Sequence, residues 1–361
     1  MIGDPQAPFS RVLEVLARHG ALDGDRLAPG VKLVSIGDHF DYDVNDPVTA
    51  GREGLRLLRW LADHSDDQVV LVFGNHDAAR VMELIGFDDS RFGEARTLAR
   101  SIAETEKRDG RAAADRRERD ELLARFPDLP TWGVAARDYA SYCADQRALV
   151  IELLLAGRFR LALTGALADG REVLITHAGV TTRELALLGI PDERAPRAIA
   201  ERLEALFAEA IERCRADWTR GVFTPLSLDP VHVTGRCGEE GGGLLYHRPA
   251  SPARPGADKP WEFAPARPRR FDPRDLPAPL RQVAGHTGHN KCLEELGEDG
   301  PTDAARARPR GGIRTLRVVD DKVTYDLGIL PDAPDAADLY LIDGELRRVD
   351  ADDYQLLELA S

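Results

Sequence analysis

The chain has 361 residues, 43% of them hydrophobic, which is enough to bury a sizeable core in one large domain or two medium ones. Its formal net charge of -14 disfavours broad nucleic-acid binding, although bound cations would still allow a phosphorylated substrate. We expect a cytoplasmic protein that does not enter a membrane, because there is no membrane-length apolar run, no signal peptide and no CxxC pair among the four cysteines.

The first third of the chain alternates predicted strands and helices. The apolar runs VKLVSIGDHFD (31–41) and QVVLVFGNHD (68–77) predict strands that are buried on both faces. Helical spacing of apolar residues predicts helices over 10–20 and 51–64. Each predicted strand stops at a polar, glycine-containing loop.

The middle of the chain combines one further strand with charged helical segments. The stretch REVLITHAG (171–179) predicts a third buried strand. Residues near 93–155 and 183–218 are helix-prone and predict helical insertions, and the charges of 93–125 indicate a solvated face.

The last third begins with a proline-rich stretch and returns to strands. Residues 249–279 contain nine of the 23 prolines and predict a long surface loop. The stretch RQVAGHTGH (281–289) predicts a fourth buried strand, and 315–327 and 338–350 predict two hairpins, the second with an Asp-Gly turn.

The loops after these strands carry residues of the types that commonly bind metals in proteins. Carboxylate, imidazole and amide oxygen groups suit divalent ions such as Mn, Fe or Zn. There are too many such groups for one ion, and two ions about 3.5–4 Å apart, joined by a bridging carboxylate, suit in-line attack on phosphorus. The candidates are Asp4, Gln6, Asp38, Asp41, Asn75, His76, Asp77, His177, His286 and His289.

Taken in order, the loops resemble the calcineurin-like metallophosphoesterase superfamily, whose pattern runs D-x-H, GD-x-x-D, GNH-[DE], H, GH-x-H. The THAG and GHT forms resemble its phosphoprotein-phosphatase branch and the bacterial relatives of that branch. The resemblance implies one domain over 1–361, an α/β fold built as a four-layer α/β/β/α sandwich with two facing mixed sheets and helical insertions. The matching segments are GDPQ (3–6), GDHFD (37–41), GNHD (74–77), THAG (176–179) and GHTGH (285–289).

The resemblance also implies a binuclear metal centre. In this centre Asp4 binds the first metal, Asp38 bridges the two metals, and Asn75, His177 and His286 bind the second metal. It implies two divalent ions, with Mn foremost and Fe or Zn as alternatives, and attack by a hydroxide that bridges them.

The proton donor of the family matches His76, which contacts phosphate and protonates the leaving oxygen. Asp41 matches the carboxylate that orients this histidine, and Asp77 supports the site from behind. A histidine with a carboxylate partner can remain protonated near neutral pH and act as a general acid.

Three positions depart from the family pattern. Asp41 is followed by a tyrosine where the phosphatase branch has a phosphate-binding arginine. We therefore take Arg248, in GGGLLYHRP, as the candidate residue that binds phosphate. The alternative is that Arg248 is a surface arginine in a loop without this role. His289 lies three residues after His286 instead of two, and is a possible ligand only. Gln6 replaces a histidine, which would weaken the first site for zinc and favour Mn, unless Gln6 merely caps the turn after Asp4.

The predicted function is hydrolysis of a phosphomonoester, carried by a protein or a small molecule. A diadenosine-polyphosphate or other nucleotide hydrolase is one alternative, for which Trp132, Trp218 and Trp261 could contribute base stacking. A binding protein that has lost catalysis but kept the scaffold is the other.

Overall fold

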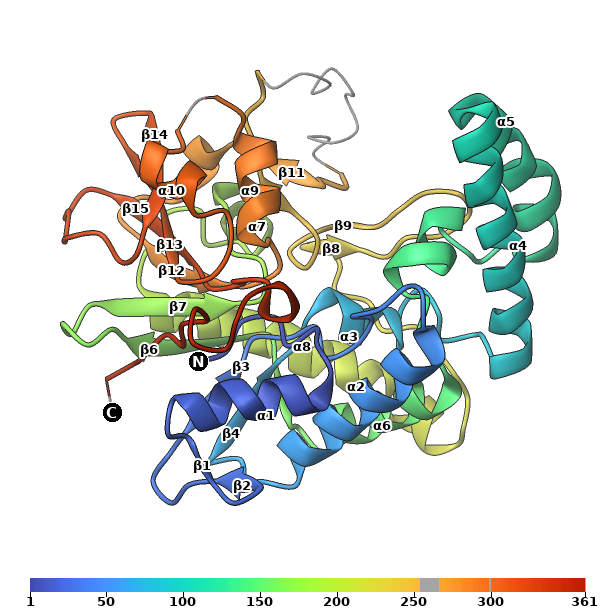
Figure 1. Cartoon of the computed structure of the whole chain (residues 1–361), viewed down its shortest axis with the longest axis horizontal. Coiled ribbons are helices and arrows are strands. Elements are labelled where there is room, and N and C mark those ends of the chain that lie inside the picture. The colour runs from blue at the N-terminus through green and yellow to red at the C-terminus, as the bar shows by residue number, and fades with distance from the viewer. Residues whose placement is uncertain (254–265, 299, 361) are drawn as a thin grey trace.

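Two sheets form the centre of the fold (Figure 1). In the computed structural model, which describes residues 1–253, 266–298 and 300–360, a mixed sheet has the strand order β14-β13-β15-β12-β7-β6 and a parallel sheet has the order β3-β4-β5. The mixed sheet consists of β6 (Ala162–Ala166), β7 (Glu172–Thr176), β12 (Arg281–Ala284), β13 (Arg314–Val319), β14 (Lys322–Leu327) and β15 (Ala337–Leu341), and the parallel sheet of β3 (Leu33–Ser35), β4 (Val69–Val72) and β5 (Phe159–Arg160).

The two sheets share one buried apolar cluster. Val72 of β4 belongs to this cluster together with Ile175 of β7, Val283 of β12 and Tyr340 of β15. These strands were predicted as buried because their apolar runs do not alternate with polar residues, and all four predicted strands are confirmed.

Helices cover the outer side of each sheet. Against the parallel sheet pack α1 (Phe9–Arg18), α2 (Pro47–Ala62) and α6 (Ala144–Leu155), while α8 (Pro196–Thr219) packs on β6 and β7. Against the far face of the mixed sheet pack α9 (His289–Leu296) and α10 (Asp303–Ala307), through Cys292, Leu296 and Ala305.

The remaining elements are short or lie at the edge of the molecule, where α4 and α5 form an arm (Figure 1). The helices are α3 (Asn75–Ala79), α4 (Asp89–Asp109), α5 (Arg111–Arg117) and α7 (Thr182–Leu187), with π-helical turns at Glu118–Leu123 and Val134–Asp138 and 3-10 turns at Pro273–Asp275 and Leu346–Arg348. The strand pairs are β1 (Leu22–Asp23) with β2 (Arg26–Leu27), β8 (His232–Val233) with β9 (Gly242–Gly243), and β10 (Arg248–Pro249) with β11 (Arg270–Phe271).

Several expectations need correction. The smaller described sheet is parallel, not mixed, because helices connect β3 to β4 and β4 to β5 and return the chain to the same edge. The hairpin over 315–327 is confirmed as β13 and β14, but the hairpin over 338–350 is wrong. There, β15 lies between β12 and β13, and the chain continues into the 3-10 turn instead of folding back.

The expected helical insertions are helical in the structure, but each contributes a helix that packs in the core: α6 from the first and α8 from the second. Leu203 and Phe207 of α8 are buried, since this helix covers two strands of the mixed sheet. The proline-rich stretch 249–279 contributes the end of β10, then β11 and a 3-10 turn, and its residues 254–265 lie outside the described part. Within the described chain, no helix combines the length and apolar character that a membrane span requires.

Candidate metal centre

The candidate ligands lie where parallel strands end side by side. Asp38 and Asn75 follow the neighbouring strands β3 and β4, and His177 and His286 follow β7 and β12, which are also neighbours. The segment before Asp4 joins the smaller sheet through a parallel bridge to the last residue of β3. Parallel strands place the loops that follow them at one edge, so five distant segments meet there.

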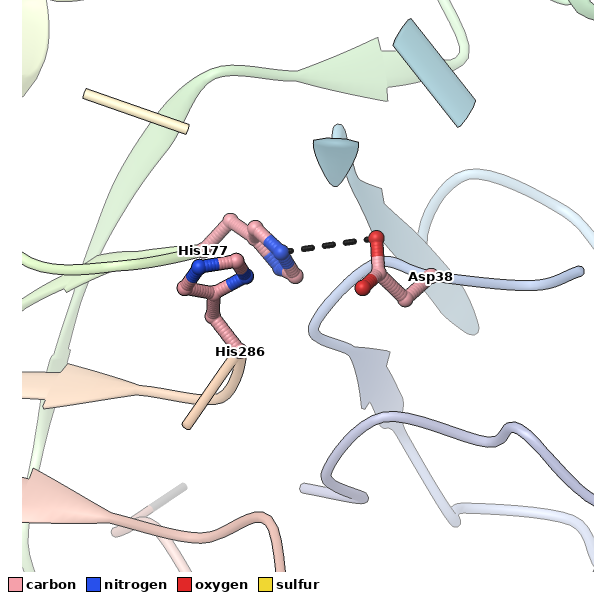
Figure 2. A group of neighbouring side chains, drawn as sticks. All are labelled: Asp38, His177 and His286. Atoms are coloured by element: carbon pink, nitrogen blue, oxygen red, sulfur yellow. Dashed lines mark ion pairs between the residues drawn. The ribbon is translucent and has the colours of Figure 1, made fainter. Parts of the chain in front are cut away.

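Asp38, His177 and His286 form a buried group that could hold a metal ion. One ligand atom from each lies within 4.8 Å of the others, and Figure 2 shows the three side chains directed toward one another. His177 Nδ1 donates to the carbonyl of Ile36 (2.8 Å), so Nε2 faces Asp38 Oδ1 (3.4 Å) and Asn75 Oδ1 (3.0 Å). Although burial opposes it, the Asp38 carboxylate raises the pKa of His177 to about 9, so this position favours positive charge.

His286 carries a ring nitrogen that lacks a partner. Its backbone N–H donates to Asp4 Oδ1 (3.0 Å) and its Nε2 donates to the carbonyl of Tyr246 (2.9 Å). Its Nδ1 is buried and has no hydrogen-bond partner among the described residues. Burial, with Arg248 nearby, holds the pKa of His286 well below its usual range, so Nδ1 presents a lone pair. An orphaned lone pair beside a carboxylate and a second imidazole suits a borderline divalent cation.

Glycines let these loops approach one another. A Cβ atom on Gly74 would lie 2.4 Å from the backbone nitrogen of Asp38, and one on Gly285 would lie 2.1 Å from Asp4 Oδ1. Asp38 (φ 58°) and His286 (φ 57°) adopt left-handed backbone conformations that are costly for residues with a side chain. Such strain clusters at sites where the surrounding structure fixes a functional group.

His76 lies beside the group with its own carboxylate partner. Its Nδ1 is 2.9 Å from Asp41 Oδ2, and its Nε2 is 3.8 Å from Asp38 Oδ2. Burial disfavours the charged imidazole, but Asp38 and Asp41 outweigh it and raise the pKa of His76. Ser141 donates to Asp41 through its N–H (2.9 Å) and hydroxyl (2.6 Å), which fixes the carboxylate.

Arg80 is a residue that sequence reasoning missed. Its guanidinium pairs with Asp41 (2.6 Å), is fully buried, and lies over the Phe40 ring (4.6 Å). Burial alone would raise the pKa of Asp41, but Arg80 and His76 hold it below its usual range. The sequence places Arg80 one helical turn after His76, the only indication that the two could share a partner.

Asp77 ties the first two loops together. Its Oδ2 accepts the backbone N–H groups of Asp38 and Gly74 (both 3.1 Å), and its Oδ1 contacts His39 Nδ1 (2.9 Å). His39 also contacts Ser35 Oγ (3.0 Å), so its ring is held within this local network. Asp77 thus fixes the backbone of the loops that carry the candidate ligands Asp38 and Asn75.

Asp4 and Gln6 line a cavity of about 690 Å³ together with Asp343, which sequence reasoning missed. Gln6 Nε2 donates to the carbonyl of Phe40 (3.1 Å). Asp343 follows β15, the neighbour of β12, and therefore reaches the same edge of the sheet. Burial and the proximity of Asp343 and Asp38 raise the pKa of Asp4 well above its usual range, and burial raises that of Asp343 to about 7. Carboxyl groups whose pKa values are raised in this way would give up their protons if a cation bound beside them.

Arg248 and His289 have different environments. Arg248 lines the cavity with His76 and His286, and its buried Nε has no hydrogen-bond partner among the described residues. His289 lies on α9, where Nε2 contacts the carbonyl of Gly312 (2.8 Å) and Nδ1 contacts the Tyr325 hydroxyl (3.3 Å). The structure therefore brings Arg248 to the site but engages both ring nitrogens of His289 elsewhere.

Comparisons of the chain with protein-family models, with curated proteins and with solved structures returned no match.

Proposed function

We propose that this chain is a metal-dependent phosphoesterase that hydrolyses a phosphomonoester, and that its two sheets and outer helices form the four-layer sandwich of the calcineurin-like metallophosphoesterase superfamily. The observation that carries the proposal is the buried group of Asp38, His177 and His286, in which His286 Nδ1 lacks a partner. A proton donor with a fixed carboxylate partner, His76, lies next to this group.

The residues present fit two divalent ions. Asn75, His177 and His286 would hold one ion, Asp4 and Gln6 the other, and Asp38 would be shared. The oxygen-rich first position favours Mn, with Fe or Zn as alternatives at the second. Such ions, when bound, supply a nucleophile at neutral pH and stabilise charge on phosphorus.

The protein's own side chains would then perform the remaining steps. Water adds its oxygen to phosphorus while the bond to the ester oxygen breaks, yielding an alcohol and inorganic phosphate. His76 gives its proton to the departing oxygen and Asp41 holds the imidazole for that transfer. Arg248 grips phosphoryl oxygens through its planar guanidinium.

The nucleotide-hydrolase alternative has less support. Trp132 and Trp218 are buried in the apolar core, so neither offers a face for stacking a base. Trp261 lies outside the described residues. The alternative of a binding protein without catalysis is disfavoured by His76, Asp41 and Arg80, a charged network that packing does not require.

Asp38→Asn tests the proposal most directly, because Asp38 would be shared by both ions. Purified wild-type protein should contain divalent metal and hydrolyse p-nitrophenyl phosphate when Mn is added. The variant should lose bound metal and hydrolysis together. A wild-type protein that binds metal but hydrolyses no phosphate ester would support the binding-protein alternative, and a variant that keeps two metals would refute the shared role of Asp38.

A further inference from the structure

A second cavity, of about 370 Å³, adjoins the catalytic one. The two cavities are adjacent, because several side chains line both of them. Arg269 and Arg270 line only the second cavity, and Tyr139 and Tyr246 form part of its wall. The shared side chains are His76, Arg137, Asp138, Arg248 and Lys291.

Positive charge is concentrated in this second cavity, although the whole chain carries a net charge of -14. Its acidic residues are Glu83, Asp138 and Glu240. Burial raises the pKa of Glu83 to about 7, so this carboxyl carries only part of its charge at neutral pH. Its cationic side chains outnumber the acidic ones, and they are Arg137, Arg248, Arg269, Arg270 and Lys291.

Neighbouring elements fix the positions of these cations. Arg248 of β10 and Arg270 of β11 are paired in register, which places two guanidinium-bearing residues side by side. Arg270 is held by Glu295 (2.8 Å), while Arg269 pairs with Glu240 and lies 5.8 Å from the centre of the Tyr246 ring. Burial and the proximity of Arg270 lower the pKa of Arg248. Arg248 differs from Arg269 and Arg270, because its Nε is buried and has no hydrogen-bond partner among the described residues. An anion bound beside Arg248 would supply that partner and an attractive charge.

We propose that the second cavity binds a second phosphoryl group, and that the substrate of this site is a small organic bisphosphate. One phosphoryl group lies at His76 and Arg248, as the proposed function requires, and the other lies against Arg269 and Arg270. A cavity of about 370 Å³ suits a phosphoryl group with a short carbon skeleton better than a folded protein segment. Planar guanidinium forks bind phosphate oxygens in pairs, which gives the subsite its selectivity.

Two probes with the same carbon chain, 1,4-butanediol bisphosphate and 4-hydroxybutyl phosphate, test this subsite. Binding is measured by calorimetry in EDTA, where the proposed hydrolysis would not occur, and kcat/KM is measured separately with Mn. We expect the bisphosphate to be preferred by about tenfold or more in both assays, the usual effect of one added charge-assisted hydrogen bond. Preferential binding without hydrolysis would retain the subsite and refute the proposed function. Equal binding of the two probes would refute the subsite, whatever the enzyme hydrolyses.

Arg269→Gln locates the preference, and Arg267→Gln is its matched control, since Arg267 pairs with Glu239 and lines neither cavity. Arg269→Gln should remove most of the preference for the bisphosphate while kcat/KM for the monophosphate and the melting temperature stay near wild type. Arg267→Gln should leave the preference intact. An equal loss for both probes in Arg269→Gln would show that Arg269 serves the site in general and would overturn its assignment to a second phosphoryl group.

Discussion

At the scale of single residues, the environment of His76 determines what it can do. Asp41 holds one ring nitrogen, and Arg80 and Ser141 hold Asp41 in turn, so the imidazole has one fixed orientation. The other ring nitrogen points toward Asp38, beside the proposed metals. In the proposed function this arrangement would separate proton transfer from metal binding, so the two roles can be tested separately.

His76→Ala should therefore affect the chemical step and leave the metal content unchanged. We expect kcat for an alkyl phosphate to fall by about 10²–10⁴, the usual size of a general-acid effect. The loss should be smaller for p-nitrophenyl phosphate, whose leaving group needs no proton. Steady-state kinetics on both substrates, with elemental analysis, checks this. An equal loss for the two substrates would leave His76 only the role of positioning phosphate.

Gln6 determines the character of the first proposed metal position. Gln6 lines the cavity, and its amide nitrogen donates to the carbonyl of Phe40, which restrains the side chain. Gln6→His should tighten zinc or iron at this position and reduce the dependence of activity on added Mn, because imidazole is a softer ligand than an amide oxygen. Metal titrations of wild type, Gln6→His and Gln6→Ala measure this. Identical Mn titrations for all three would show that Gln6 is not a ligand.

At the scale of elements, the sequence predicts which candidate residues the fold brings together wherever a buried strand ends in a polar loop. Asp38, Asn75, His177 and His286 were found in this way, since an unbroken apolar run marks the strand and the parallel order of strands brings the loops together. Pairing between strands could not be read from the chain, which is why a parallel sheet was expected to be mixed.

Asp343 shows the limit of the same reasoning. It also follows a buried strand, but Asp-Gly is so typical of a hairpin turn that the turn was predicted instead. Arg80 was missed because its partner Asp41 is 39 positions away in the chain and only the fold reveals the contact. His289 was included as a possible metal ligand because its distance in sequence from His286 is close to the family pattern. In the structure α9 begins at His289, and the side chain contacts Tyr325 instead.

The close contact between the first two loops depends on Gly74. A Cβ atom there would lie 2.4 Å from both the backbone nitrogen and Oδ1 of Asp38. Gly74→Ala should therefore displace Asp38, weaken metal binding and lower the free energy of unfolding by about 1–3 kcal/mol, as overpacking does. Gly86→Ala is the matched control, since a Cβ atom there meets nothing within 4 Å. Urea denaturation and metal analysis of both variants check this, and a Gly74→Ala protein with wild-type metal content would contradict it.

At the scale of the whole molecule, one buried carboxyl group connects segments that are far apart in the chain. Glu83 Oε1 accepts the backbone N–H of Gly235 (3.1 Å) and the Tyr246 hydroxyl (3.4 Å). The Tyr246 hydroxyl contacts that of Tyr139, which in turn lies 3.5 Å from Asn75 Nδ2. The wall of the second cavity and the candidate metal centre thus share one hydrogen-bonded network, and the charge of this network depends on Glu83.

The ionisation of Glu83 should make the stability of the protein depend on pH. Burial raises the pKa of Glu83 from its usual value of 4.5 to about 7 in the folded protein, so the folded state binds this proton more tightly than the unfolded state. The resulting stabilisation is complete below pH 4.5 and is lost as the pH rises through 7. A difference of this size corresponds to about 3 kcal/mol.

Glu83→Gln keeps an oxygen to accept the same hydrogen bonds but cannot ionise. The free energy of unfolding of the variant, relative to wild type, should therefore increase by about 3 kcal/mol between pH 4.5 and pH 8. Urea denaturation across this range measures the difference, and Glu201→Gln on the exposed side of α8 serves as the control for removing a surface carboxylate. A constant difference between Glu83→Gln and wild type across the range would mean that Glu83 ionises without cost in the fold, and the network would then be anchored by a charged carboxylate.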